Sequence, residues 1–337
     1  MGAGVGKVRW GVLSTAAIAL QKVIPGLRRS SLGEVTAIAS RSEVAARSAA
    51  AALEIPRWHG TYEALLADPD VDAVYIPLPN HLHMEWSIRA LQAGKHVLCE
   101  KPLALTAADA ERMFEAADGA GRLLMEAFMY RHHPSWIALR DVVASGRLGR
   151  LTAVDSWFSY YNDDPANIRS VLAYGGGALY DIGCYSVNLS RMLFAAEPRT
   201  VSASIVRDPA SGVDVLTSGT LGFDGGVASF TCATRVEADQ RVHVYGTRGR
   251  AAIEIPFNIP PTLPTRVFVT QGGDPPVAPA TETLEFAPAD PYACEADAFA
   301  RAVLDGAPAP VPPSDAIANL RVIDRLFAAG ASAGVEG

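Results

Sequence analysis

Three side chains in this sequence could together move a proton while a hydride is transferred. Lys101 lies in a Glu-Lys-Pro segment that follows the apolar run 96–99, and such a run predicts a buried strand. Ligands of open α/β sheets bind at the carboxyl ends of strands, which is where Lys101 would emerge. Asp181 and Tyr185 lie far downstream, four residues apart, so one helix face can present both. An ammonium, a carboxylate and a phenol around one cleft indicate acid/base chemistry.

The residues before 130 predict the domain that would carry Lys101. Short β-rich runs at 8–13, 35–39, 73–78, 96–99 and 123–127 alternate with helix-like segments at 18–29, 42–53, 62–67, 84–93 and 107–120. Such alternation predicts a parallel sheet covered by helices on both faces. We therefore expect an α/β chain whose residues 1–130 form a Rossmann domain.

The pattern changes after Pro134. A helix at 135–145 precedes strand-like runs at 151–158, 200–206, 226–234, 241–245 and 251–255. The segment 256–288 is rich in Pro and Gly and predicts loop with one or two strands, before helices at 292–304 and 313–328. Runs of strands with few helices predict an antiparallel sheet. Residues 131–337 should form an α+β domain with a large, open, mostly antiparallel sheet, whose last helix could pack back on the first domain.

The composition predicts a folded globular chain of two domains. Its 337 residues exceed one ordinary core, and 49% are hydrophobic against 19% charged. The net charge of −7 argues against nucleic-acid partners, which require basic surface. No run approaches the roughly 18 apolar residues of a membrane helix, and the first residues lack the order of a signal peptide. Four scattered cysteines favour free thiols in a reducing cytoplasm: Cys99, Cys184, Cys232 and Cys294.

The turn after the first strand could hold a dinucleotide. A strict G-x-G-x-x-G motif is missing, but small residues occupy its positions at Ser14, Ala16 and Ala19. A pyrophosphate could therefore approach the helix N-terminus, although small residues at such a turn can also serve packing alone. The candidate cofactor-binding residues here are Ser14, Thr15, Ala16, Ala17 and Ile18.

The end of the second predicted strand bears on which nicotinamide cofactor would bind. An NAD enzyme would carry an acidic residue there, whereas this chain has Ser40 and Arg41. A guanidinium beside a hydroxyl suits a 2′-phosphate, which favours NADP(H) over NAD(H). The alternative is a helix-start pair that faces water.

The third predicted strand breaks into a turn whose residues could line the ribose and the nicotinamide, namely Leu78 and Asn80. His83 could act in the chemistry, but a helix-capping or surface histidine is favoured. His81 and His83 have no nearby Cys or paired carboxylates to complete a metal shell, so we expect no metal site.

Taken together, these motifs resemble the glucose–fructose oxidoreductase and inositol dehydrogenase family, written Gfo/Idh/MocA. The Glu-Lys-Pro block and a Gly-Gly-Gly…Asp-x-Gly-x-Tyr block carry the match, which runs through residues 10–19, 39–41, 72–81, 93–102, 125–134 and 175–185. The resemblance implies an N-terminal Rossmann domain, NAD(P), and sugar or polyol substrates. It places Glu100 and Lys101 at the cofactor, with Lys101 also at the substrate. Asp181 and Tyr185 would complete the site, with Tyr185 where many members have His.

The tyrosine, the glycine-poor loop and residues 162–169 resemble the NADP-using branch. This implies hydride transfer between NADP(H) and a hydroxyl or keto carbon, with an aldose 1-dehydrogenase favoured. Nucleotide-linked keto-sugar reduction and dihydrodiol oxidation stay open, as does a sensor that binds NADP(H) without turnover. The family's open sheet commonly forms the oligomer contact, which implies a homodimer or homotetramer.

We expect a distinct role for each of the three side chains that could act in the chemistry. Tyr185 is the proton donor or acceptor and Lys101 orients the substrate oxygen, although Lys101 could itself be the acid. Asp181 should fix a substrate hydroxyl or the lysine. Further candidates for the sugar pocket are Arg169, Asn188 and His133; Arg169 could equally anchor a loop through Asp163 or Asp164. An aryl diol would need aromatic walls, which Trp157, Phe158, Tyr160 and Tyr161 could supply, although strand aromatics more often fill the core.

Overall fold

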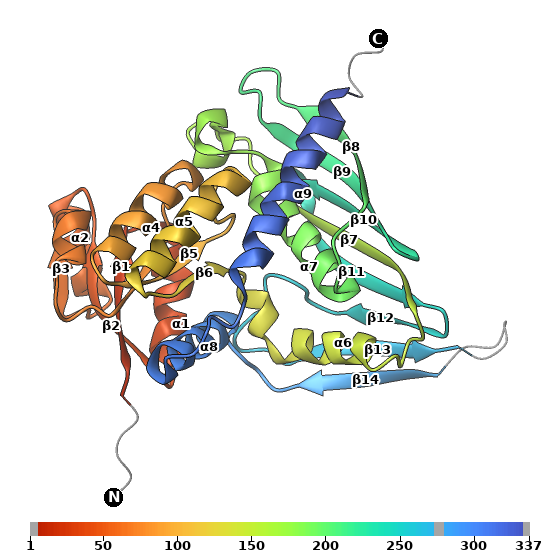
Figure 1. Cartoon of the computed structure of the whole chain (residues 1–337), viewed down its shortest axis with the longest axis horizontal. Helices are drawn as coiled ribbons and strands as arrows, with labels where there is room; N and C mark the ends of the chain where they lie inside the picture. Colours follow the sequence, from red (N-terminus) through yellow and green to blue (C-terminus); the bar gives the residue numbers. More distant parts are fainter. Residues whose placement is uncertain (1–5, 273–279, 333–337) are drawn as a thin grey trace, which may run out of the picture. The chain divides into compact units, whose positions relative to one another are not determined.

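The computed structural model describes residues 6–272 and 280–332 (Figure 1). Contacts divide the described chain into two compact units. The first contains the residues up to His132 together with Asp290–Ile317, and the second contains His133–Ala289 and the residues from Ala318 onward. The sequence-based boundary assigned 290–317 to the second domain; the contacts place this segment in the first.

The first unit is built on a six-stranded sheet in the order β3-β2-β1-β4-β5-β6. All five strand pairings are parallel, which confirms the expected Rossmann architecture. From β1 the strand order runs through β2 to β3 on one side and through β4 and β5 to β6 on the other, so it reverses between β1 and β4. Doubly wound sheets bind their ligands at this point. Only β3 is missing from the prediction, because its three residues contain no apolar run. The strands are β1 (Val8–Leu13), β2 (Gly33–Ala39), β3 (Arg57–His59), β4 (Ala73–Ile76), β5 (His96–Glu100) and β6 (Leu124–Ala127).

Helices connect these strands, and local capping fixes where several of them begin. The hydroxyls of Ser42, Thr61 and Thr106 accept the first free N–H groups of α2, α3 and α5. Gly121, at φ +60°, ends α5 in the left-handed region that favours glycine. The helices are η1 (Ala19–Val23), α1 (Ile24–Arg29), α2 (Glu43–Ala52), α3 (Tyr62–Leu66), η2 (Asn80–Leu82), α4 (His83–Gln92), α5 (Ala107–Ala120) and η3 (Met129–His132).

Helix α8 (Pro291–Asp305) belongs to this unit although it follows the second sheet in sequence. Phe299 is fully buried, with its ring centroid 5.5 Å from that of Trp10 on β1. At the helix start, Asp290 accepts from Arg29 at 2.6 Å. The helix therefore completes the core over β1. An amphipathic pattern shows that a helix has a partner, but it does not show which sheet, so the sequence could not make this assignment.

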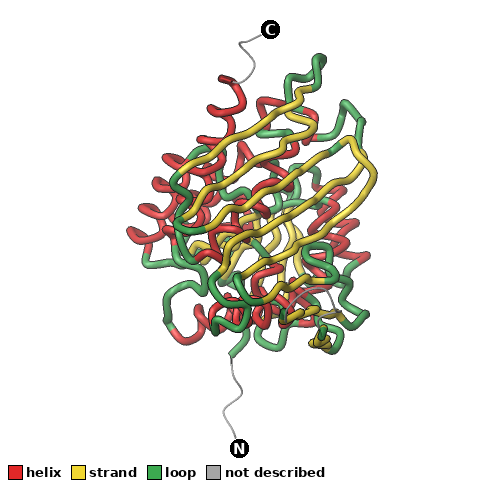
Figure 2. The backbone as a smooth tube through the Cα atoms, turned by 90° about the vertical axis from the view of Figure 1, so that its right-hand side faces the viewer, coloured by secondary structure: helices red, strands yellow, loops and turns green. Residues whose placement is uncertain are grey.

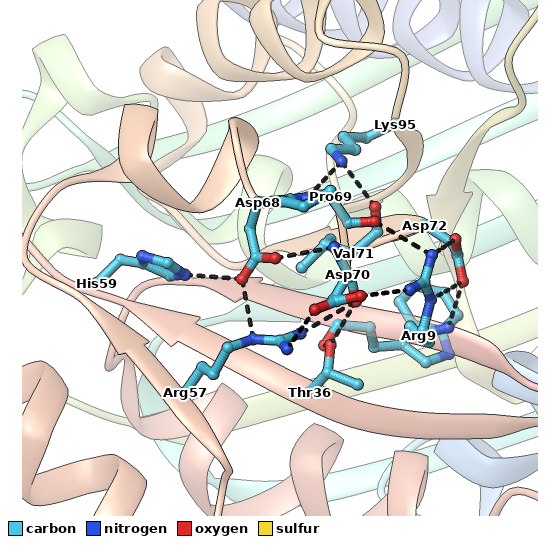
Figure 3. A network of polar contacts seen from close by, with 11 residues as sticks. Arg9, Thr36, Arg57, His59, Asp68, Pro69, Asp70, Val71, Asp72 and Lys95 are labelled. Atoms are coloured by element: carbon cyan, nitrogen blue, oxygen red, sulfur yellow. Dashed lines mark hydrogen bonds and ion pairs between the residues drawn. The ribbon is translucent and has the colours of Figure 1, made fainter.

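A charged network ties the amino ends of the strands together (Figure 3). Arg9 on β1 donates from Nε and Nη2 to Asp72, which precedes β4, at 2.9 and 2.7 Å. Arg57 on β3 and Arg9 both bind Asp70. The Lys95 ammonium, ahead of β5, donates to the carbonyl oxygens of Asp68 and Val71 at 2.7 Å. Because the candidate cofactor residues follow the strands, this network lies at the other end of the sheet and holds it together.

The second unit is built on an eight-stranded sheet in the order β14-β13-β12-β11-β7-β10-β9-β8 (Figure 1). Only the pairing of β7 with β10 is parallel, which confirms a mostly antiparallel sheet. The prediction missed β9, whose Gly, Ser and Thr residues weaken the strand pattern. The strands are β7 (Leu151–Tyr161), β8 (Thr200–Arg207), β9 (Asp214–Phe223), β10 (Gly226–Ala233), β11 (Arg235–Gly246), β12 (Gly249–Ile253), β13 (Thr265–Gln271) and β14 (Thr281–Phe286).

One face of this sheet is covered by helices and the other is open. Helix α6 packs on β12, β13 and β14, and α7 packs on β7. Beneath them the ring of Phe257 stacks on Phe158 at 4.7 Å and on Trp136 at 6.4 Å. In Figure 2 the face turned to the viewer shows strands without a covering helix. The helices are α6 (Pro134–Ala144), η4 (Ile168–Ser170), η5 (Leu172–Tyr174), η6 (Leu179–Gly183), α7 (Cys184–Phe194) and α9 (Pro313–Ser332), the last from residue 318 onward.

Candidate active site

The turn after β1 has the backbone geometry that a phosphate site needs. Ser14 has a φ of +146°, and its hydroxyl accepts the N–H of Ala16 at 3.2 Å. Ala17 is exposed, while Thr15, Ala16 and Ile18 are half-buried. Small side chains and an accessible helix start at the switch point of the sheet fit a dinucleotide pyrophosphate.

Arg41 lies exposed in the turn that follows β2. The turn is held by Ser40, whose N–H donates to the His59 carbonyl at 3.2 Å and whose hydroxyl accepts the Ser42 N–H at 3.2 Å. Burial raises the pKa of the neighbouring Tyr62, and the Arg41 guanidinium opposes that rise. An exposed cation on a fixed turn, beside a phenol, fits recognition of a 2′-phosphate.

His83 differs from the expectation of a surface histidine. It is fully buried at the start of α4, with Nδ1 2.9 Å from the Pro102 carbonyl oxygen and Nε2 2.7 Å from that of Leu78. Burial lowers its pKa to about 4. The ring therefore joins the segment after β4 to the Glu-Lys-Pro segment after β5. Its effect on a bound ligand would be indirect, through the backbone that it holds in place. Leu78 is also buried, and Asn80 is half-buried in η2.

The Glu-Lys-Pro segment is braced by two acids, the half-buried Glu100 and the buried Glu126. Glu100, the last residue of β5, accepts from the Tyr75 hydroxyl at 2.6 Å and from the Lys101 N–H at 3.2 Å. The Lys101–Pro102 peptide bond is cis, and Glu126 accepts the N–H of Leu103 at 2.8 Å. The half-buried Lys101 thus stands on backbone fixed from both sides, at the carboxyl end of its strand.

Two further buried groups surround Glu100, and sequence reasoning did not find them. Burial, and then the charge of Glu100, raise the pKa of Tyr75 well above its ordinary value. The same two causes raise the pKa of Glu295, which is 2% exposed on α8. Glu295 could not be foreseen because its helix was assigned to the other domain.

In the second unit, a glycine turn places Asp181. A Cβ at Gly176 would collide with the carbonyl of Arg169, and Gly177 has a φ of +115°. Beneath the turn, the fully buried Asp214 accepts from the Leu179 N–H at 2.8 Å and from the Thr217 hydroxyl at 2.9 Å. Burial raises the pKa of Asp214. Gly176 and Gly177 are therefore needed for close packing between this turn and its supports.

Asp181 itself is 8% exposed and carries two donors on one oxygen. Its Oδ2 accepts from the Tyr160 hydroxyl at 2.5 Å and lies 2.8 Å from Nε of Arg169. Arg169 was expected at the sugar pocket or at Asp163 or Asp164; the ion pair that it makes is with Asp181. Tyr160 was considered only as an aromatic wall.

Tyr185 lies one helical turn after Asp181, on α7. It is 5% exposed, and its ring meets those of Phe158 at 5.7 Å and Phe257 at 5.2 Å, edge to face. Asn188 is fully buried on the same helix. His133 is fully buried too, and its Nδ1 caps α6 at Ser135, 2.8 Å from the hydroxyl. That cap gives His133 a structural role, which sequence reasoning did not assign.

The four aromatics of β7 do not line one pocket. Strand alternation places Phe158 and Tyr160 on one face and Trp157 and Tyr161 on the other. Trp157 lies under the guanidinium of Arg241, and Tyr161 is 63% exposed. An aryl-diol pocket walled by all four is therefore wrong.

The described residues offer neither a metal site nor a membrane-spanning helix. No three His, Cys, Asp or Glu side chains there lie where they could hold a metal ion. Within the same residues, no helix has the length and apolar composition to cross a membrane. All four cysteines are free thiols, and Cys294 is the one that is half-buried rather than buried.

Comparison with known proteins identifies the family. The description "Oxidoreductase family, NAD-binding Rossmann fold" matches residues 8–128, and "GFO/IDH/MocA C-terminal domain" matches residues 136–252. An uncharacterized oxidoreductase of Rhizobium meliloti is 44% identical over 95% of this chain and 96% of its own length. A D-xylose 1-dehydrogenase (NADP+) of Haloferax volcanii is 40% identical over 94% and 96%. The solved 3-ketoreductase of Actinomadura kijaniata, bound to NADP and TDP-benzene, superposes with a TM-score of 0.88 at 33% identity, covering 96% of this chain and 98% of that one. This chain therefore belongs to the GFO/IDH/MocA family of oxidoreductases, as its motifs predicted.

Proposed function

We propose that this protein is an NADP(H)-dependent oxidoreductase that transfers a hydride to or from a hydroxyl or keto carbon of a sugar or polyol, most closely as an aldose 1-dehydrogenase. The observation that carries the proposal is Lys101, braced at the carboxyl end of β5 in a Rossmann sheet. The 40% identity to a D-xylose 1-dehydrogenase that uses NADP+ supports both the reaction and the cofactor.

The first unit would hold the cofactor. The turn at residues 14–18 would take the pyrophosphate, and Ser40 with Arg41 would take the 2′-phosphate. Leu78, Asn80, Glu100 and Lys101 would surround the ribose and the nicotinamide, while His83 would fix two of these segments from behind. When bound, the nicotinamide supplies or accepts the hydride.

The chain's own residues would manage the proton. Tyr185 is assigned as proton donor or acceptor, because an alcohol whose carbon gives up a hydride must also lose the proton of its hydroxyl oxygen. Lys101 is assigned to the substrate oxygen, where an ammonium stabilises developing negative charge. Asp181 would fix a neighbouring hydroxyl. A Lys101→Met variant with near-normal turnover would contradict either role of the lysine, as orienter or as acid.

A nucleotide-linked keto-sugar reductase is the second candidate. The superposition with the Actinomadura ketoreductase over nearly the whole chain favours it. The dihydrodiol alternative has no such support in the site, because the β7 aromatics divide between two faces.

One set of measurements separates these candidates from each other and from a sensor. NADPH and NADH fluorescence titrations give the cofactor preference. A panel of aldoses, polyols, nucleotide-linked keto-sugars and diols, followed through the absorbance of reduced nicotinamide, gives the substrate. Turnover of a simple aldose with NADP+ supports the main proposal. Tight NADPH binding without turnover on the whole panel would favour the sensor, and an NADH preference would overturn the role of Arg41.

We also propose that the open face of the eight-stranded sheet pairs copies of this chain into a dimer or tetramer in the cytoplasm. Small polar residues line that face along β8, β9 and β10, including Ser202, Ser218 and Ser229. A flat face of this kind can meet its symmetry mate closely. Sedimentation at the mass of a monomer would contradict the assembly.

A further inference from the structure

Tyr160 is a half-buried phenol that the assigned chemistry does not use. It lies on β7 and donates to Oδ2 of Asp181 at 2.5 Å. Phe158, two residues earlier on the same strand, packs edge to face on Tyr185. One strand face therefore supports both Asp181 and Tyr185, through a hydrogen bond in one case and a ring contact in the other.

Arg169 completes the support of the carboxylate. Its Nε lies 2.8 Å from the same Oδ2, and its side chain is 43% exposed. Its backbone is fixed twice, since the Arg169 carbonyl accepts the Gly177 N–H at 2.9 Å and its N–H donates to the Asn167 side chain at 3.0 Å. Two donors from separate elements meet at one oxygen, and this sets the plane and direction of the Asp181 carboxylate.

The state of Tyr160 suits a permanent donor. Burial, and then the charge of Asp181, raise its pKa far above the ordinary value for tyrosine. It therefore keeps its proton throughout the neutral range. A phenol in this state is suited to holding a carboxylate in place and is a weak acid toward a substrate.

We propose that Tyr160 and Arg169 form a clamp that positions Asp181 for the reaction, which makes Tyr160 a positioning residue. The inference rests on the proposed function, because it gives Asp181 a substrate hydroxyl to bind. Without the Tyr160 hydroxyl, the carboxylate can rotate away from its productive direction. Small misplacements of this kind cost about 10- to 100-fold in rate.

The chain offers a matched control. Tyr161 is the next residue on β7, faces the opposite way, and is 63% exposed with a hydrogen bond to Asp163 at 3.2 Å. Tyr160→Phe and Tyr161→Phe each remove one phenolic hydroxyl from the same strand. We expect kcat/KM to fall about 10- to 100-fold for Tyr160→Phe and by less than twofold for Tyr161→Phe. The dissociation constant for NADPH, measured by fluorescence, should stay within about twofold of wild type in both, because the cofactor residues lie in the first unit.

A second readout does not depend on activity. Thermal midpoints are compared for wild type, Tyr160→Phe, Asp181→Asn and the double variant. The clamp predicts that the loss in the double variant is smaller than the sum of the single losses. Losses that add would overturn the clamp, and unchanged kcat/KM in Tyr160→Phe would overturn the positioning role. If wild type turns over no compound of the panel, the proposed function fails and the positioning role falls with it, while non-additive midpoints still establish the clamp.

Discussion

Gly177 provides the sharpest test of how the Asp181 turn is built. Its φ of +115° lies in a region that L residues rarely adopt, and an added Cβ would collide with Oδ1 of Asp214. Asp214 cannot retreat cheaply, because it is fully buried and holds the Leu179 N–H and the Thr217 hydroxyl. Gly177→Ala should therefore damage both the stability of the second unit and the position of Asp181.

The magnitude follows from these two contributions. A non-glycine residue in such a conformation costs about 1–3 kcal/mol. Displacing a buried carboxylate from a hydrogen bond costs about 1.5–3 kcal/mol for each bond weakened. We expect a loss of about 4 kcal/mol in the free energy of unfolding, which corresponds to a midpoint lower by about 10 °C for a unit of this size.

Gly146→Ala is the control for Gly177→Ala. Gly146 has a φ of +69° in the same unit, but no heavy atom lies within 4 Å of its added Cβ. That variant should lose only about 1–2 kcal/mol, from backbone strain alone. The two variants are compared by thermal and urea unfolding. A Gly177→Ala protein within about 1 kcal/mol of the control would refute the claim that Asp214 and the glycine turn are packed against each other.

The same variant links the turn to the chemistry. The Asp181 N–H donates to the Gly177 carbonyl at 3.1 Å, so movement of the turn moves the carboxylate. We expect kcat to fall more than about tenfold while NADPH affinity is retained, since the proposed cofactor residues lie in the other unit. Loss of NADPH affinity in step with kcat would indicate general unfolding instead, and would contradict a local effect.

Three further predictions concern single residues. Tyr185→Phe should retain NADPH affinity and lose about 10²–10⁴-fold in kcat, as measured by steady-state kinetics; a smaller loss would move the acid/base role elsewhere. Arg41→Ala should raise the KM for NADP+ about 10- to 100-fold and leave that for NAD+ within about twofold, which an equal loss for both cofactors would contradict. Burial lowers the pKa of His83 to about 4, so between about pH 6.5 and 4 the unfolded state binds a proton at this residue and the folded state does not. The free energy of unfolding should therefore fall as the pH drops through this range. His83→Gln should flatten urea-unfolding free energies over that window, and an unchanged slope would contradict the assignment.

The sequence predicted the elements whose patterns are complete within a short window. Strand β1 and helix α5 match residue for residue, because an apolar run and an amphipathic repeat with a Thr106 cap are local signals. Strands β3 and β9 were not predicted, because their residues carry no local strand pattern and join the sheet only through pairing with other strands. Ala37 pairs with Arg57, and Gly219 packs on the ring of Phe230, and neither partner can be read from the strand itself.

The candidate site shows the same division. Lys101, Asp181 and Tyr185 could be singled out because their types and neighbouring glycines or prolines form recognisable blocks. The residues that hold these side chains in place could not be identified from the sequence, since each comes from a distant segment. Asp214 holds the Leu179 N–H from 35 residues downstream, and Tyr160 reaches the Asp181 carboxylate from 21 residues upstream. Burial of polar groups is a property of the assembled fold, and no spacing rule reports it.

Tyr160 and Tyr185 have different groups packed against them, and this bears on which of the two could carry a proton. Tyr160 donates to a carboxylate, and a negative neighbour favours the neutral phenol, so its pKa rises. Tyr185 lies between the rings of Phe158 and Phe257, neither of which carries charge. A phenol held beside a carboxylate is a poor acid for a substrate at neutral pH. This difference supports the proposal that Tyr185 carries the proton and that Tyr160 keeps Asp181 in place.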